Sequence, residues 1–145
     1  MPSQVIAIAA DHGGFELKRE LAGFLANQGY EVLDLGTHSP DAVDYPDVAG
    51  RLAGALRDGR TERGVLICGT GIGIGIAANR FPGIRAATCS NVTLARLARQ
   101  HNDANVLSLG ARVIGFEAAR DILLTFLTTP FDGGERHQRR IDKLG

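Results

Sequence analysis

The chain has 145 residues, close to the commonest size of one domain, of which 44% are hydrophobic and 22% are charged. This composition is that of an ordinary globular protein and excludes a disordered or fibrous chain. Sixteen basic residues balance 16 acidic ones, and zero net charge argues against a surface built for nucleic acid or anionic membrane. Zero net charge does not exclude a local anion-binding site, because 14 of the basic residues are Arg, which binds phosphate or carboxylate well. The alternative is a genomic bias toward Arg, which would give the same count.

The two cysteines, Cys68 and Cys89, are too few for a disulfide framework and lack the C-x-x-C spacing of a metal site. The N-terminal residues carry no basic region, and the apolar run at residues 5–10 is too short for a signal or membrane segment. We therefore expect a cytoplasmic protein.

Short apolar runs alternate with amphipathic stretches along the chain. The first half predicts a strand at residues 5–10, a helix that ends before Gly29 and a strand at 31–35. A long loop then leads to residues 44–46, and a helix follows to about Asp58. The middle predicts a strand at 64–68, a glycine-rich loop at 69–75, a short helix at 76–80 and a strand at 84–89. The last part predicts a helix capped by Ser90 or Asn91 that ends near His101, a strand at 105–109, a helix stopped by Pro130, and a basic helix from about Glu135.

Repeated β-α units whose strands are continuously apolar are typical of a parallel sheet covered on both faces. We predict one α/β domain over residues 1–145, with a doubly wound, Rossmann-like, five-stranded parallel sheet, helices on both faces and a C-terminal helical tail at about 131–145. Ligands of such sheets bind beyond the carboxyl ends of the strands, which singles out residues 11–12, 68–75, 90–91 and 110–112.

Residues 69–75 contain four glycines between a predicted strand and a predicted helix. Glycine lets the backbone approach a ligand closely, and N–H groups at a helix N-terminus attract negative charge, so this segment is typical of an anion-binding loop. It lacks the Gly-Lys-Ser/Thr ending of a P-loop and fits the dinucleotide-binding pattern poorly. The alternative is that the glycines serve only tight packing.

Cys68 stands at the end of the third predicted strand, directly before this loop. A helix N-terminus stabilises the thiolate form of a nearby cysteine, which suits a nucleophile or a base. A phosphatase loop of the C-x5-R type is excluded, because position 74 is Ile instead of Arg. The alternative for Cys68 is a buried, inert thiol, which is what we expect of Cys89 within its strand.

Histidines and arginines mark three further places. His12 follows the first predicted strand, which favours a role toward a ligand. His101, at a helix end, either caps that helix or acts as an acid or base. Arg136 and Arg140 share one helical face at i, i+4, which either binds an anion or is a solvated charged face. Arg112 follows the fifth predicted strand and is therefore better placed to meet a ligand than Arg136 or Arg140.

Six segments, taken together in their order and spacing, resemble the type B ribose-5-phosphate isomerases, a family that also holds allose-6-phosphate and galactose-6-phosphate isomerases. These segments are residues 10–15 (ADHGGF), 44–46 (DYP), 67–74 (ICGTGIGI), 76–80 (IAANR), 99–106 (RQHNDANV) and 136–140 (RHQRR). The resemblance covers essentially the whole chain.

The resemblance implies interconversion of ribose 5-phosphate and ribulose 5-phosphate through an enediolate, with no metal or organic cofactor. The catalytic residues that it implies are Cys68 as the base, His101 assisting ring opening, and Thr70. The substrate-binding residues that it implies are Asp11, His12, Tyr45, Gly69, Gly71, Gly73, Asn102, Arg112, Arg136 and Arg140. Backbone N–H groups of residues 69–73 would stabilise the enediolate, and His12 with the three arginines would bind the phosphate.

The resemblance also implies a homodimer or homotetramer with active sites at the subunit interface. His101, Asn102 and Arg112 would then serve a neighbour's Cys68, and an isolated chain would be inactive. Another branch of the family replaces the Cys with a Glu at the position matching Ile74; this chain has the Cys. It departs from many relatives at Gly75, where Ser is common, which bears on details of the loop and on sugar preference.

Two alternatives remain. The substrate would be a six-carbon sugar phosphate such as allose 6-phosphate, or an unphosphorylated rare sugar, if Gly75 or the loop at 37–43 widens the pocket. The chain would otherwise be a non-catalytic, flavodoxin-like binding module. A phosphorylated receiver of that fold would need an acid at the end of the third strand and Lys at the end of the fifth, where this chain has Cys68 and Gly110.

Overall fold

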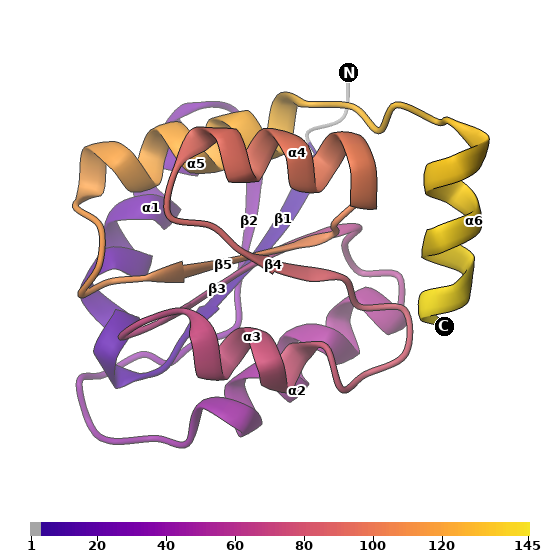
Figure 1. The fold of residues 1–145 in the computed structure, drawn as a ribbon. Coiled ribbons are helices and arrows are strands. Elements are labelled where there is room, and N and C mark those ends of the chain that lie inside the picture. The colour runs from indigo at the N-terminus through magenta and orange to yellow at the C-terminus, as the bar shows by residue number, and fades with distance from the viewer. Residues whose placement is uncertain (1–3) are drawn as a thin grey trace.

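The computed structural model describes residues 4–145, in which five parallel strands form one sheet in the order β2-β1-β3-β5-β4 (Figure 1). The strands are β1 (Val5–Ala10), β2 (Glu31–Asp34), β3 (Arg63–Cys68), β4 (Ala86–Thr88) and β5 (Val106–Gly110). Residues 1–3, part of the N-terminus in which we expected no targeting signal, lie outside the described residues. Across 4–145, no helix has the length and apolar character needed to cross a membrane.

Helices cover both faces of the sheet, as the alternation of elements predicted. On one face lie α1 (Phe15–Asn27), α4 (Val92–Asn102) and α5 (Phe116–Thr128), and on the other lie α2 (Tyr45–Arg57) and α3 (Ile72–Ala78). A short 3-10 helix, His12–Gly14, joins β1 to α1. The predicted doubly wound, five-stranded parallel sheet is confirmed.

The apolar run of β1 is buried on both sides, which explains why it does not alternate with polar residues. Successive side chains of a strand point to opposite faces, so Ile6 and Ile8 join the core under α1, α4 and α5, while Ala7 and Ala9 join the core under α2 and α3. All four side chains are fully buried. The central strands are therefore rigidly held, and their carboxyl ends are fixed relative to one another.

The predicted bounds of α3 and β4 were wrong. Helix α3 begins at Ile72, inside the glycine-rich segment, because Gly71 adopts a left-handed conformation that starts the helix early. Strand β4 spans only Ala86–Thr88, since it lies at the sheet edge and has one neighbouring strand, β5. Cys89 therefore lies just beyond β4 rather than within it. The cap of α4 is Asn91, whose side chain accepts from the Leu94 N–H at 2.8 Å.

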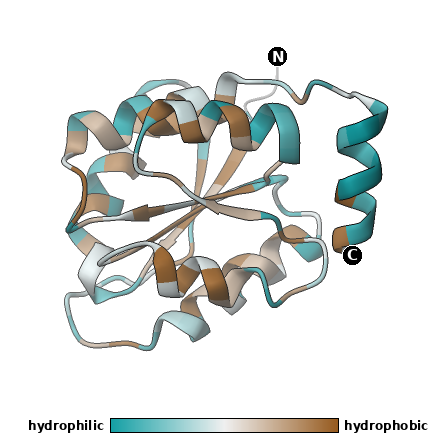
Figure 2. Cartoon of the chain, in the orientation of Figure 1, coloured by the Kyte–Doolittle hydropathy of each residue, from teal (hydrophilic) through white to brown (hydrophobic). Residues whose placement is uncertain are grey.

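The C-terminal helix α6 (Glu135–Leu144) packs beside the end of α4 instead of on the sheet (Figure 1). Figure 2 shows a mostly hydrophilic helix, in agreement with the predicted basic tail. Ile141 is its buried residue, while Arg136 and Arg140 are exposed. The charged face of α6 is thus presented to solvent or to another molecule.

Candidate active site

The carboxyl ends of β1 and β3 lie side by side, and the helices that follow these strands go to opposite faces of the sheet. In this architecture, ligands usually bind where such a reversal occurs, beyond the carboxyl ends of the strands. The backbone N–H of Asp11 donates to the Ile67 carbonyl at 3.1 Å, which fixes the start of one loop against the end of the neighbouring strand. Residues 11–14 and 68–73 therefore form the two sides of one site.

Cys68 is the last residue of β3 and is 5% exposed. Its Sγ accepts a hydrogen bond from the Gly71 N–H at 3.1 Å, at the start of α3. This contact fixes the position of the sulfur relative to the start of α3. Gly71 has a φ of +79°, and a Cβ there would lie 2.8 Å from the backbone of Leu109, so this turn needs glycine.

Asp11 and His12 come from the segment that follows β1. Asp11 is buried, and its Oδ1 accepts from the Gly13 N–H at 2.9 Å. His12 is exposed, and its Nδ1 accepts from the Val43 N–H at 3.2 Å. Because Nδ1 accepts, Nε2 is the ring nitrogen that can donate to a ligand. This side of the site thus offers an acceptor for sugar hydroxyls and a donor for an anion.

Thr70 and Gly73 lie at the start of α3, and Tyr45 is the first residue of α2. The Thr70 Oγ1 accepts from the Ile72 N–H at 3.1 Å and so satisfies a free donor of the first helical turn. The Tyr45 ring lies close over Gly73, where a Cβ would be 2.8 Å from its Cζ. Tyr45 is 41% exposed, so its ring forms a wall of the site and its hydroxyl remains accessible.

Arg112 lies beside Gly69 of its own chain. Its backbone N–H donates to the Gly69 carbonyl at 2.9 Å, and a Cβ at Gly69 would be 3.5 Å from its Nε. Arg112 thus lies beside the glycine-rich loop of its own chain, whereas we had expected it to serve a neighbour's Cys68 together with His101. The physical reason is the strand order, because β5 pairs with β3 and Gly110 lies level with Cys68.

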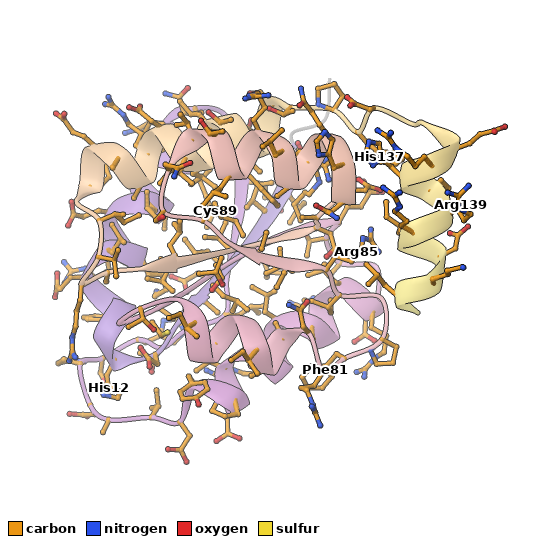
Figure 3. All side chains as sticks on the ribbon, in the orientation of Figure 1. His12, Phe81, Arg85, Cys89, His137 and Arg139 are labelled. Atoms are coloured by element: carbon orange, nitrogen blue, oxygen red, sulfur yellow. The ribbon has the colours of Figure 1, made fainter. Side chains whose placement is uncertain are left out.

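The remaining predicted residues, which are His101, Asn102, Arg136 and Arg140, form a second group near the amino ends of the strands. Helix α4 runs from the carboxyl end of β4 back to the amino end of β5, so its 11 residues carry His101 and Asn102 about 16 Å from its start. Arg136 and Arg140 lie on α6, next to that end of α4. Figure 3 shows His12 and His137 at opposite ends of the molecule. One chain alone therefore does not bring all predicted residues together.

His137 and Asp132 belong to this second group and had no role in our sequence prediction. The rings of His101 and His137 are stacked, and ligand atoms of His101, Asp132 and His137 lie within 4.8 Å of one another. Partial burial, then the charges of His101 and Arg136, lower the pKa of His137. These positive charges favour an anion over a metal ion here. The sequence signal for His137 was its position between Arg136 and Arg140; Asp132 had none.

Cys89 is the second free thiol and plays no part in the site. It is 3% exposed, and burial raises the pKa of its thiol to about 11. A thiol of that pKa stays protonated near neutral pH and is a poor nucleophile. The expectation of an inert Cys89 agrees with this burial.

The fold and the site together define an enzyme of the Rossmann-like α/β class, whose site joins a thiol, a carboxylate and a glycine-rich helix N-terminus. The model of the Ribose/Galactose Isomerase family matches residues 6–144, and the chain belongs to that family. The family resemblance inferred from the six sequence segments is thereby confirmed.

Individual relatives agree with this assignment. The chain is 49% identical to ribose-5-phosphate isomerase B of Escherichia coli over 139 residues, which is 96% of this chain and 93% of the relative. It is 44% identical over 142 residues to D-erythrulose-4-phosphate isomerase of Pectobacterium atrosepticum, covering 97% and 92% of the two chains. The structure of Clostridium thermocellum ribose-5-phosphate isomerase B superposes with a TM-score of 0.96 at 54% identity, covering 98% of this chain and 95% of that one.

Proposed function

We propose that this isomerase interconverts ribose 5-phosphate and ribulose 5-phosphate, with Cys68 as the base. The observation that carries the proposal is the Gly71 N–H directed at the Cys68 sulfur, at the end of a strand whose neighbour leads into the buried Asp11. Similarity to proteins named ribose-5-phosphate isomerase B over nearly the whole chain supports this choice of sugar.

In the proposed reaction, the Cys68 thiolate takes a proton from carbon 2 of the open-chain aldose, and the electron pair left behind forms an enediolate. The same proton returns to carbon 1, while a proton passes from the carbon-2 oxygen to the carbon-1 oxygen, which gives the ketose. Backbone N–H groups at the start of α3 stabilise the negative oxygen, and each such donor contributes about 3–4 kcal/mol in other enzymes. Thr70 lies beside these donors, and Asp11 accepts from sugar hydroxyls.

We further propose that a second copy of the chain completes each site, giving a homodimer or a pair of such dimers. The second copy supplies His101 for ring opening and Asn102, Arg136 and Arg140 for binding, since these residues lie at the far edge of their own chain. Exposed apolar side chains next to the Cys68 loop support an interface here, among them Ile72 (58% exposed) and Ile76 (61%).

The proposed chemistry requires a reduced thiol. Both cysteines are free, and a thiolate base would be lost on oxidation. A reducing compartment such as the cytoplasm is therefore our proposed location.

A direct rate comparison tests the choice of substrate. Ribose 5-phosphate, allose 6-phosphate, D-erythrulose 4-phosphate and unphosphorylated ribose are supplied to the wild-type chain and to Cys68→Ala. We expect the highest kcat/KM for ribose 5-phosphate, and a loss of turnover with retained binding in Cys68→Ala. A higher kcat/KM for another sugar would identify that sugar as the substrate instead of ribose 5-phosphate. Unchanged turnover of Cys68→Ala would disprove the proposed role of Cys68.

The second candidate substrate is a sugar phosphate of different length. The 44% identity to a D-erythrulose-4-phosphate isomerase favours this possibility, because one family scaffold carries both names. The same site chemistry would serve either sugar, and only the distance between the reacting carbons and the phosphate of the substrate would differ.

A further inference from the structure

The carbonyl oxygen of Gly71 accepts three hydrogen bonds. Donors are the Ser108 hydroxyl, the Thr88 hydroxyl at 3.2 Å and the Gly75 N–H at 3.2 Å. A carbonyl oxygen has two lone pairs, so three donors fix its direction firmly. Ser108 is fully buried in β5, and Thr88 of β4 is its partner in the strand register, which brings both hydroxyls to one point.

The other polar group of the same residue faces the thiol, because the Gly71 N–H donates to the Cys68 sulfur. Glycine has wide conformational freedom, and Gly71 adopts a φ of +79° that few other residues accept. The direction of its N–H therefore depends on contacts that hold the rest of the residue. Holding the carbonyl restricts the torsion angles that Gly71 can adopt and, with them, the direction of its N–H.

We propose that Ser108, assisted by Thr88, is a positioning residue for the Cys68 base. Neither hydroxyl touches the sulfur; both act through Gly71. This inference rests on the proposed role of Cys68 and adds two residues, on strands β5 and β4, to the machinery of the reaction.

Gly75 supplies an independent reason to connect these groups. A Cβ at position 75 would lie 2.8 Å from the Thr88 Oγ1 and 3.3 Å from the Ser108 Oγ, so glycine leaves room for the two hydroxyls. Residue 75 is one helical turn after Gly71, and a serine there can bond back to the carbonyl four residues earlier. Ser at 75 and the pair Thr88 and Ser108 are therefore alternative ways to hold one carbonyl.

The test compares Ser108→Ala, Thr88→Ala and the double variant with the wild-type chain. We expect kcat for ribose 5-phosphate to fall about tenfold in the double variant, in line with the loss of one or two hydrogen bonds. The KM should stay within about a factor of two, since no substrate-binding group is removed. The pH–rate profile is recorded for each variant, because a loss of stability alone would leave its shape unchanged.

Thr61→Val is the matched control. Thr61 is 5% exposed, and its hydroxyl donates to the Val5 carbonyl at 2.8 Å, at the amino ends of the strands. The variant therefore loses a buried hydrogen bond without any change near Gly71. We expect lower stability in this control and an unchanged kcat and pH profile.

Rescue separates positioning from simple destabilisation. Adding Gly75→Ser to the double variant should restore most of kcat, whereas Gly75→Ser alone should lower it, because its Cβ meets the Thr88 hydroxyl. An unchanged kcat and pH profile in the double variant, or a failed rescue in a folded triple variant, would overturn the inference. Cys68→Ala is assayed in parallel: if that variant keeps its turnover, the proposed function fails, independently of Ser108.

Discussion

The imidazole rings of His101 and His137 are stacked, with centroids 4.5 Å apart and 11° between their planes. This contact joins the end of α4 to α6, and the N–H of Asp132 adds a 3.1 Å bond to the Gln100 carbonyl. The histidines and arginines of the second group are therefore held together in one chain before any substrate binds. Their distance from Cys68 of the same chain leads to the first prediction.

Mixed oligomers of two inactive variants should regain activity. Cys68→Ala and His101→Ala are each expected to be inactive, but a hybrid dimer keeps one site with an intact Cys68 from one chain and an intact His101 from the other. Co-expressed, differently tagged chains purified as a random mixture should show about a quarter of the wild-type rate, as two-fold symmetry requires.

The control for this experiment mixes Cys68→Ala with Asp11→Asn. Both changes lie in the same half-site, so every hybrid site lacks one of its own groups. We expect no recovery in that mixture. An inactive Cys68→Ala and His101→Ala hybrid would contradict a shared site.

Arg136→Gln and Arg140→Gln should weaken binding of phosphorylated sugars. Charge-assisted hydrogen bonds to phosphate contribute about 1.5–3 kcal/mol each, so we expect KM for ribose 5-phosphate to rise about 10- to 100-fold per change. Steady-state kinetics at several salt concentrations checks this, with Arg139→Gln, an exposed neighbour on α6, as the control. Equal losses on unphosphorylated ribose would instead assign these arginines a structural role.

Metal removal should leave the reaction rate unchanged. Proton transfer by the Cys68 thiol and stabilisation of the enediolate by backbone N–H groups require no metal. Within residues 4–145, the only cluster of candidate metal ligands is His101, Asp132 and His137, which lies beside Arg136 and Arg140. The protein is dialysed against a chelator and assayed before and after addition of zinc, manganese or magnesium ions. Activity that is lost on dialysis and restored by one of these metals would contradict the prediction.

Cys89 should make stability depend on pH above 9. Burial raises the pKa of this thiol from 9.0 to about 11, so between these values the unfolded chain loses a proton that the folded chain keeps. The free energy of unfolding therefore falls as pH rises through that window, by about 2–3 kcal/mol, and is unaffected by Cys89 below it.

Urea unfolding of the wild-type chain and of Cys89→Ala at pH 8 and pH 11 measures this difference. The variant loses packing at both pH values, but its free energy of unfolding should fall less between pH 8 and pH 11 than that of the wild-type chain. Parallel declines would show that the Cys89 thiol does not titrate as expected.

Much of this molecule follows from local sequence. The apolar run of β1 and the cap at Asn91 are short-range patterns, and the sequence placed Cys68 at a strand end before a glycine-rich helix start. The segments around Asp11, Cys68 and His101 were also enough to indicate the family. These features could be predicted because propensity, burial and capping act over a few residues.

Tertiary structure decided how these pieces meet. Only the order β2-β1-β3-β5-β4 brings Arg112 to Gly69 and separates His101 from Cys68, because strand pairing joins segments far apart in the chain. The same pairing aligns Thr88 with Ser108 over the Gly71 carbonyl, a contact that no spacing in the sequence encodes. The sequence thus determined which groups are available for chemistry, and the sheet determined which of them act on the same atoms.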